Sequence, residues 1–289
     1  AKELGLVIVF LRPLGLHLTS DDDDLIKDIM ETNVITVDTL EDKELVAAQF
    51  AKYDFLALPV VDQEFRIVGI VTFDDAMDVI QEENTEDFSR MAAMSPSDDS
   101  YFKTPVIIHA KNRIMWLLIL MLSATITGAI ITRYEAAFAA VPILVSFIPM
   151  LTGTGGNCGS QTSTMVIRGM SLGEIRLKDF FKVMFKEFRI AIIVSIILAV
   201  VNGVRIYITY TYFNTDAGVD PLKLAVTVSL AIISTVIMSK LIGCMLPMAA
   251  KKLKLDPALM AAPLISTIVD TCTTLVFFNI AMVIFGIQI

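Results

Sequence analysis

The chain has 289 residues, of which 55% are hydrophobic, and its formal net charge at pH 7 is −8. This apolar fraction excludes an ordinary soluble domain, and the length allows about two domains. Residues 1–110 carry 23 acidic and 8 basic side chains, whereas residues 111–289 carry 8 acidic and 15 basic ones. We therefore expect an acidic, water-facing segment followed by a membrane segment. The acidic segment repels nucleic acid and attracts cations, so no nucleic-acid partner is expected.

The chain begins inside a strand-like apolar run. Residues 2–11 are predicted as a short turn and strand, and four aspartates, Asp21 to Asp24, follow as a solvated loop or helix start. The first twenty residues contain an apolar patch but neither the basic n-region nor the cleavage pattern of a signal peptide. We expect a chain whose N-terminal part is missing.

The next segment is predicted as a small α/β unit. Strands are expected at residues 34–37, 55–61 and 67–72, with an amphipathic helix at residues 41–53. Another helix is expected to start at Thr72, where Asp75 three residues later makes an acidic variant of a capping box.

The order of these elements, with L-P-V-V-D at residues 58–62 and G-I-V-T-F-D-D at residues 69–75, resembles a CBS domain. Residues 5–14 resemble the same end motif from a preceding repeat, but Phe10 and Pro13 replace its Ser/Thr and Asp. In CBS pairs the Thr and Asp of this motif often contact an adenine nucleotide. The resemblance therefore implies ATP contacts at Thr72 and Asp75 only, and the alternative is a helix N-cap without a ligand.

Residues 74–94 are predicted as one long acidic helix. Five acids lie three or four residues apart along one side: Asp78, Glu82, Glu83, Glu86 and Asp87. Like charges at this spacing destabilise a helix, and a divalent cation would relieve the repulsion. The alternative is a solvated helix face. Pro96 and its polar neighbours are expected to end the helix.

Hydropathy predicts five membrane spans of about 20 residues, the length that a hydrocarbon core of about 30 Å requires. They are expected at residues 114–132, 136–167, 190–213, 222–246 and 259–286, with a soluble amphipathic helix at residues 171–188. The loops after the second and fourth spans hold most of the Lys and Arg residues. The positive-inside rule then puts these loops and the acidic segment in the cytoplasm, and the C-terminus outside.

The second span is expected to be broken by a Gly-rich stretch at residues 149–169, P-M-L-T-G-T-G-G-N-C-G-S-Q-T-S-T-M-V-I-R-G. Polar or loosened backbone at membrane depth survives only inside protein or beside water, and glycine exposes backbone carbonyls. We interpret the stretch, with Gly153 and Asn157, as the lining of a pore or ion site. The alternatives are a helix-packing surface of small residues and a simple loop.

One acid, Asp270, lies far from both ends of the fifth predicted span. A carboxylate at that depth is a candidate functional group because its burial costs several kcal/mol unless it faces water, a partner or an ion. Hydroxyls of Ser266, Thr267, Thr273 and Thr274 flank it at helical spacing. The alternative is a structural ion pair with Lys240 in the fourth span, or with Asn202 and Arg205 in the third.

An oxygen-only set of Asp270, Asn157, Ser266 and the Gly153 carbonyl suits a hard cation. One carboxylate favours Mg²⁺ in particular, since Mg²⁺ keeps several of its waters. Softer metals call for clustered Cys or His, whereas Cys158, Cys244 and Cys272 fit no metal or disulfide spacing and are expected to be free thiols.

Long motifs now resemble the MgtE family of magnesium channels and transporters. They are T-E-D-F at residues 85–88, S-A-T-I-T-G at 123–128, F-I-P-M-L-T-G-T-G-G-N-C-G-S-Q at 147–161, V-I-R-G at 166–169 and K-L-K-L-D-P-A-L-M-A-A-P-L-I-S-T-I-V-D at 252–270. The resemblance implies a homodimer in the cell membrane, with a pore on its two-fold axis and an all-α polytopic domain of five helices per subunit. A small α/β CBS domain is implied to precede that domain.

The resemblance also implies roles for individual residues. It places the pore-ion carboxylate at Asp270, a pore lining at Asn157 and the glycines, and gating by cytosolic Mg²⁺. The regulatory ligands would be among Glu82, Glu83, Glu86 and Asp87, with Asp75 and Asp78 nearby. The family's N-terminal helical domain and most of its first CBS repeat are absent, which weakens the expected Mg²⁺ sensing.

The resulting predicted organisation has four parts. Residues 1–20 are the remnant of a first CBS repeat, 21–84 a CBS domain, 85–110 an acidic connecting helix and linker, and 111–289 the pore domain. Rival readings are an exchanger coupled to Na⁺ or H⁺ and a nucleotide sensor with a membrane anchor. An ATP-driven pump or enzyme is not expected, since the sequence has neither a P-loop nor a catalytic set of side chains.

Overall fold

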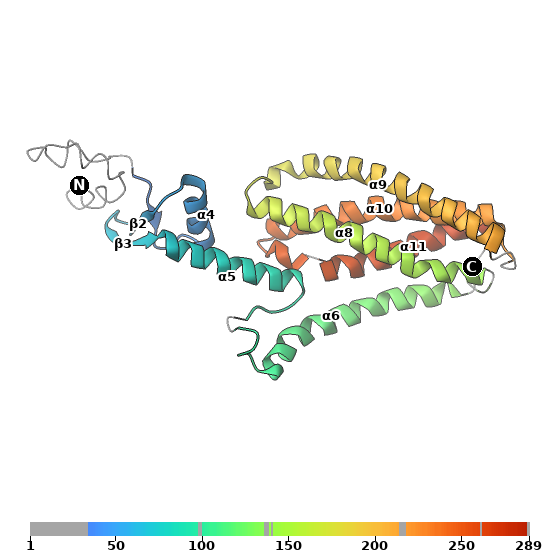
Figure 1. Ribbon diagram of the computed structural model, residues 1–289, viewed down its shortest axis with the longest axis horizontal. Coiled ribbons are helices and arrows are strands. Elements are labelled where there is room, and N and C mark those ends of the chain that lie inside the picture. The colour runs from blue at the N-terminus through green and yellow to red at the C-terminus, as the bar shows by residue number, and fades with distance from the viewer. Residues whose placement is uncertain are drawn as a thin grey trace, which may run out of the picture. The chain divides into compact units, whose positions relative to one another are not determined.

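The computed structural model describes residues 34–97, 100–135, 139, 141–213, 218–260 and 262–287. The chain divides into two compact units, Ala1–Glu86 and Asp87–Ile289, each with its own hydrophobic core (Figure 1). The expected remnant of a first CBS repeat, residues 1–20, lies outside the described residues.

The N-terminal unit is built on a three-stranded sheet of order β1-β2-β3. Strand β1 (Val37–Asp38) pairs in parallel with β2 (Ala57–Val61), and β2 pairs antiparallel with β3 (Ile67–Thr72). Helix α4 (Lys43–Tyr53) connects β1 to β2 and is capped by Asp42, whose carboxylate accepts from the Glu44 N–H. Phe50 and Leu58 fill the centre of the small core. The predicted α/β unit is confirmed.

The predicted acidic helix is confirmed as α5 (Phe73–Met91). The helix begins at the expected cap, which Thr72 and Asp75 form. The Thr72 N–H donates to the Asp75 carboxylate at 3.0 Å, and the Thr72 hydroxyl donates to the same oxygen. These hydrogen bonds lower the pKa of Asp75 because they stabilise its charged form.

The C-terminal unit consists of long helices. They are α6 (Val106–Arg133), α8 (Ile148–Ser171), α9 (Phe180–Ile208), α10 (Pro221–Lys252) and α11 (Ala262–Phe285). Within the described residues, four helical stretches are long and apolar enough to cross a membrane: Val106–Arg133, Leu177–Phe213, Pro221–Lys252 and Pro257–Phe285. Helix α8 has 24 residues but is more polar. The predicted all-α polytopic unit is therefore confirmed, whereas the count of five spans stays a prediction.

The predicted break in the second span is wrong. Helix α8 runs without interruption through the whole Gly-rich stretch as far as Ser171. The chain is irregular just before it, where the 3₁₀-helix η1 (Pro142–Phe147) leads into α8 and Pro149 occupies its first turn. Most glycines of the stretch are helix-packing positions, in agreement with the alternative of a packing surface of small residues, whereas Gly153 is exposed.

The predicted separate amphipathic helix at residues 171–188 is also wrong. Helix α8 ends at Ser171, a short 3₁₀-helix η2 (Leu177–Asp179) follows, and α9 then continues from Phe180 to Ile208. A π-helical turn, η3 (Thr209–Phe213), extends its far end. The basic side chains of residues 182–189 therefore belong to the first turns of a spanning helix.

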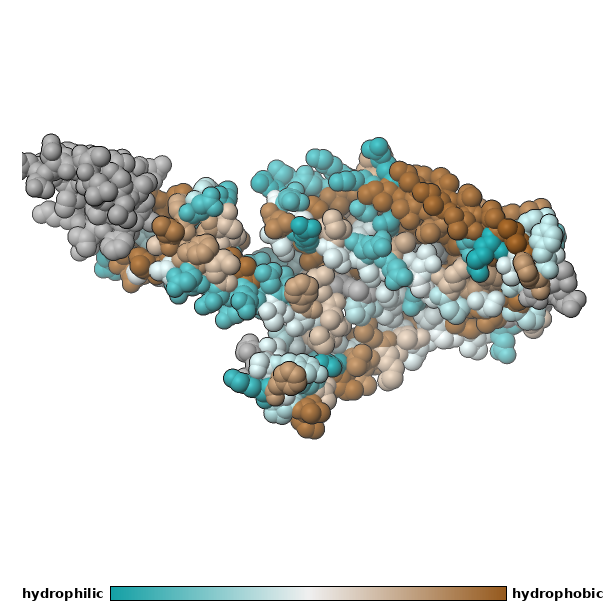
Figure 2. All heavy atoms as spheres, viewed as in Figure 1, coloured by the Kyte–Doolittle hydropathy of each residue, from teal (hydrophilic) through white to brown (hydrophobic). Residues whose placement is uncertain are grey.

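The backbones of α8 and α10 approach each other closely at one point. A β-carbon on Gly243 of α10 would stand inside contact distance of the Gly159 carbonyl of α8. Helices α8, α9, α10 and α11 lie side by side in one bundle (Figure 1). The outer surface of α9 is apolar over several turns (Figure 2), with Ile193, Ile197 and Val201 among its exposed side chains. Such a surface suits contact with lipid.

Candidate functional site

Helices α8 and α11 meet at the level of the two predicted site residues. A β-carbon on Gly155 would stand 2.7 Å from Val269 Cγ1, and one on Gly156 would stand 3.0 Å from the Ser266 hydroxyl oxygen. Asn157 and Asp270 each follow one of these contact residues in the chain. The structure thus brings the two elements together at one depth.

Asp270 is half-buried in the middle of α11. No hydrogen bond or ion pair engages its carboxylate among the residues that the structure describes. Two of the four flanking hydroxyls bond to their own helix: Thr274 donates to the Asp270 carbonyl at 2.7 Å and Thr267 to the Pro263 carbonyl at 2.9 Å. Of the predicted hydroxyl stripe, Ser266 is the member that touches α8.

Two faces of α8 differ sharply in burial. Gly155, Gly156 and Gly159 are buried against α10 and α11. The opposite face carries exposed Gly153, Asn157, Gln161 and Thr164, three or four residues apart. One side of this helix is therefore a polar stripe that the other described residues of the chain leave exposed.

The alternative of a structural ion pair between Asp270 and Lys240 is wrong. Lys240 is buried in α10, where its ammonium lies 3.8 Å from the carboxylate of Glu187 in α9. It also donates to the Thr162 hydroxyl at 3.1 Å, and that hydroxyl donates to Glu187 at 2.8 Å. The other candidates are also engaged, since the Arg205 guanidinium donates to Asn202 at 2.8 Å.

Sequence reasoning missed Glu187 altogether. The signal was present, because this single acid stands among Lys182, Lys186 and Arg189 at the start of an apolar helix. The reading of that segment as a soluble helix concealed it, since an acid on a solvated helix needs no partner.

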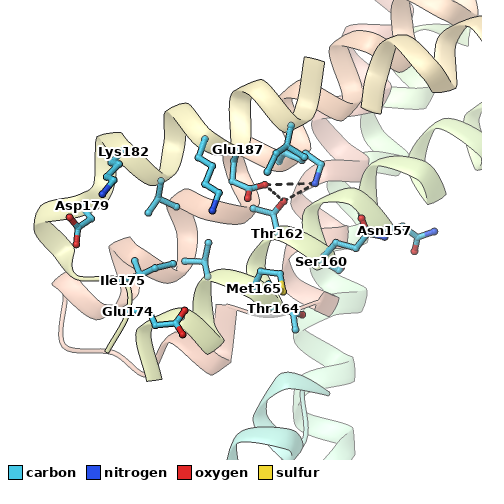
Figure 3. Close-up of a pocket in the computed structure, with 17 residues that line it drawn as sticks. Asn157, Ser160, Thr162, Thr164, Met165, Glu174, Ile175, Asp179, Lys182 and Glu187 are labelled. Atoms are coloured by element: carbon cyan, nitrogen blue, oxygen red, sulfur yellow. Dashed lines mark hydrogen bonds and ion pairs between the residues drawn. The ribbon is translucent and has the colours of Figure 1, made fainter. Parts of the chain in front are cut away.

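The buried pair opens into a hollow of about 1140 Å³ between α8 and the first half of α9. Figure 3 shows Thr162 and Glu187 beside each other at its floor, joined by the dashed contacts, with Ser160 and Asn157 further along α8. Lys182 and Asp179 lie at its other end (Figure 3). The hollow therefore connects the charged pair with the polar stripe of α8.

The predicted regulatory acids lie on α5. Lys43 of α4 contacts two of them, with its ammonium 2.9 Å from Glu83 and 3.7 Å from Glu82. The hydrogen bond and the charge of Glu83 raise the pKa of Lys43. Asp75 serves in the helix cap. Among the described residues, no group of three or more His, Cys, Asp or Glu side chains converges to hold a metal ion.

The three cysteines are free thiols, as predicted. The fold and the site together define a class of protein. It is a multi-pass membrane protein with a small CBS-type domain, in which α8 carries a polar stripe and the adjacent helix α11 carries Asp270. Residues 148–280 match the MgtE family model, described as a divalent cation transporter, and residues 26–82 match the CBS domain model. Residues 148–280 therefore carry an MgtE-type domain, and the chain is similar to the MgtE family over most of its length.

Relatives agree with this assignment. The chain is 36% identical over 264 residues to the magnesium transporter MgtE of Bacillus subtilis, covering 91% of this chain and 56% of the relative. It is 34% identical over 274 residues to the magnesium transporter MgtE of Thermus thermophilus, covering 95% of this chain and 58% of the relative. The chain thus spans a little over half the length of these relatives. Their names are those of transporters, a non-enzymatic class.

A solved structure is similar over a smaller part. The cytosolic domain of the Mg²⁺ channel MgtE in complex with ATP is 46% identical over 24% of this chain and 27% of that one, with a TM-score of 0.23.

Proposed function

We propose that this chain forms the pore and part of the cytosolic sensor of a transporter that admits Mg²⁺ to the cytoplasm. The observation that carries the proposal is the unengaged carboxylate of Asp270 at the same depth as the exposed polar stripe of α8. Packing among the described residues explains neither feature, and both are expected where a hydrated cation crosses a membrane.

The polar stripe supports a dimer. Asn157, Gln161 and Thr164 would be costly against lipid, which offers no hydrogen bonds. A second copy that brings its own stripe to a shared axis would enclose a polar passage between the two chains. Helix α6 fits an assembly as well, since none of its described residues is buried.

Asp270 would attract the ion, the side-chain oxygens of Asn157 and Ser266 would line its route, and Gly153 would leave room for the ion beside α8. A single carboxylate per chain suits Mg²⁺ because this ion is usually held through its waters by one or two carboxylates. The exclusive use of oxygen groups disfavours softer metals. The positive-inside rule puts the basic start of α9 and the acidic unit in the cytoplasm.

Gating follows from the acids of α5. Asp78, Glu82, Glu86 and Asp87 lie on a helix whose like charges repel when Mg²⁺ is scarce. Bound Mg²⁺ would relieve this repulsion in the closed arrangement and shift the population towards it by its differential affinity.

Flux measurements test the proposal directly. The full chain, reconstituted in vesicles, is expected to admit Mg²⁺, detected by an internal indicator dye, and Asp270→Asn is expected to abolish the flux. Glu135→Gln, which removes an exposed carboxylate outside α11, is the control. Normal flux in Asp270→Asn would refute the pore assignment. Single-channel current steps would favour a channel over an exchanger coupled to Na⁺ or H⁺.

A further inference from the structure

The contact of Glu187 and Lys240 places two opposite charges inside the membrane unit. Lys240 is twelve residues from the end of α10, about 18 Å along the helix axis. Only 6% of its side chain is exposed, and 13% of the Glu187 side chain. Charges at such depth are costly and are retained chiefly where they serve a function.

The pair is tied to the helix that carries the polar stripe. The Thr162 hydroxyl stands between the two charges, accepting from Lys240 and donating to Glu187. Thr162 follows Asn157 by five residues, a rise of about 7.5 Å along α8. Asn157 and the pair line the same hollow, so the charged pair and the proposed cation route border one continuous space.

A lone ammonium at this place would oppose a divalent cation. For a unit charge and Mg²⁺ about 10 Å apart, with an effective dielectric constant of about 20, the repulsion corresponds to a factor on the order of 100 in occupancy. Lys182 and Lys186 also line the hollow, but they are exposed, so water and salt screen them. Lys240 is buried and depends on Glu187 for compensation.

We propose that Glu187 is the counter-charge that makes the cation route along α8 compatible with the buried Lys240, and so sets the affinity of that route for divalent cations. This inference rests on the proposed function. It differs from a purely mechanical role, in which the pair only clamps α8 to α9 and α10. A clamp fails alike when either partner is lost, whereas a counter-charge predicts opposite effects of the two losses.

The test measures initial Mg²⁺ influx against external Mg²⁺ concentration in vesicles that contain the full chain. Glu187→Gln leaves an unpaired cation and is expected to lower influx at least about tenfold. Lys240→Met leaves an unpaired carboxylate and is expected to keep the maximal rate within about threefold, with a lower half-saturating Mg²⁺ concentration. The double variant removes both charges and is expected to recover most of the influx that Glu187→Gln loses.

Matched controls remove the same charge types elsewhere. Glu135→Gln and Lys178→Met change exposed residues that do not line the hollow and are expected to leave both kinetic constants unchanged. Equal losses in the two single variants without recovery in the double variant would overturn the inference. If Glu187→Gln fails to fold, Lys240→Met and the double variant decide, because an unchanged or raised half-saturating concentration in Lys240→Met contradicts it. Absence of flux in the unaltered chain, or normal flux in Asp270→Asn, would refute the proposed function instead.

Discussion

Gly156 of α8 faces Ser266 of α11 so closely that a β-carbon on the glycine would stand 3.0 Å from the serine hydroxyl oxygen. This contact fixes the relative level of the two helices. Asn157 follows Gly156 in α8, and Asp270 lies one helical turn after Ser266 in α11. Because the glycines of α8 have no side chains, α11, which carries Asp270, can pack closely against α8, which carries Asn157.

The first prediction concerns the closest backbone approach. Gly243→Ala places a methyl group against the Gly159 backbone, so α8 and α10 have to separate, and we expect a loss of about 1–3 kcal/mol of stability. Thermal or denaturant unfolding of the purified chain in detergent measures the change. Gly128→Ala, whose β-carbon meets nothing within 4 Å, is the control and is expected to change stability by less than about 1 kcal/mol. Equal stabilities of the two variants would contradict the close contact.

The second prediction concerns Lys43, which occupies part of the acidic face of α5. Lys43→Ala removes a cation that competes with Mg²⁺ for Glu82 and Glu83, so closure is expected at lower cytosolic Mg²⁺ concentrations. Mg²⁺ inhibition of flux measures the effect. Lys52→Ala, on the same helix but over the Tyr53 ring, should leave the inhibition curve in place. A curve that moves to higher Mg²⁺ in Lys43→Ala would argue against competition.

The third prediction concerns the acids near the end of α5. Glu86→Gln combined with Asp87→Asn removes two charges whose repulsion Mg²⁺ is proposed to relieve, and closure by Mg²⁺ is expected to weaken. The same flux assay, at several internal Mg²⁺ concentrations, provides the readout. Glu64→Gln alters an acid in the β2–β3 turn that already pairs with Arg66, and serves as the control. Unchanged inhibition in the double variant would rule these two acids out as sensors.

The fourth prediction concerns pH. The folded-state pKa of Asp75 lies below its ordinary value because Thr72 donates two hydrogen bonds to the carboxylate. Its contribution to stability is therefore present above the unfolded-state pKa, about 3.9, and is lost as pH falls through the lower folded-state value. Asp75→Ala is expected to be less stable than the unaltered chain at pH 6, and the difference should shrink as the pH falls below the unfolded-state pKa of about 3.9. Circular dichroism across this range provides the comparison, and a constant difference would contradict the cap.

A companion measurement addresses the nucleotide. Thr72 and Asp75 stabilise the start of α5 by bonding to each other, which supports the N-cap reading of this motif. Titration of the full chain with ATP, compared between the unaltered chain and Asp75→Ala, separates a cap from a nucleotide contact. Equal affinities for ATP in the two chains would show that Asp75 caps the helix and does not contact the nucleotide.

Much of this architecture was predictable because it depends on local chemistry. Alternating apolar residues and turn signals predicted β2, β3 and α4, and the unbroken run of helix-compatible residues predicted α5. Asp270 was identified by its charge alone, since an acid in an apolar span stands out in any sequence. These features need no knowledge of what lies opposite them.

The unpredicted features all depend on partners distant in the sequence. Continuity of α8 through Gly155 and Gly159 follows from the close approach of α10 and α11, which the Gly-rich sequence does not reveal. The pairing of Lys240 with Glu187 joins two helices, and either residue read alone suggests another role. Local propensity leaves such choices open, and tertiary packing decides them.

At the level of Gly159 and Gly243, the backbones of α8 and α10 meet without side chains between them. We expect this close packing to resist sliding of α8 and α10 along each other, because an axial shift would bring their backbones into steric overlap. We therefore expect a bundle that turns as a solid body, in which a passage beside α8 widens or narrows only when whole subunits tilt against each other. The glycines that permit the close approach would then also determine where in the assembly motion occurs.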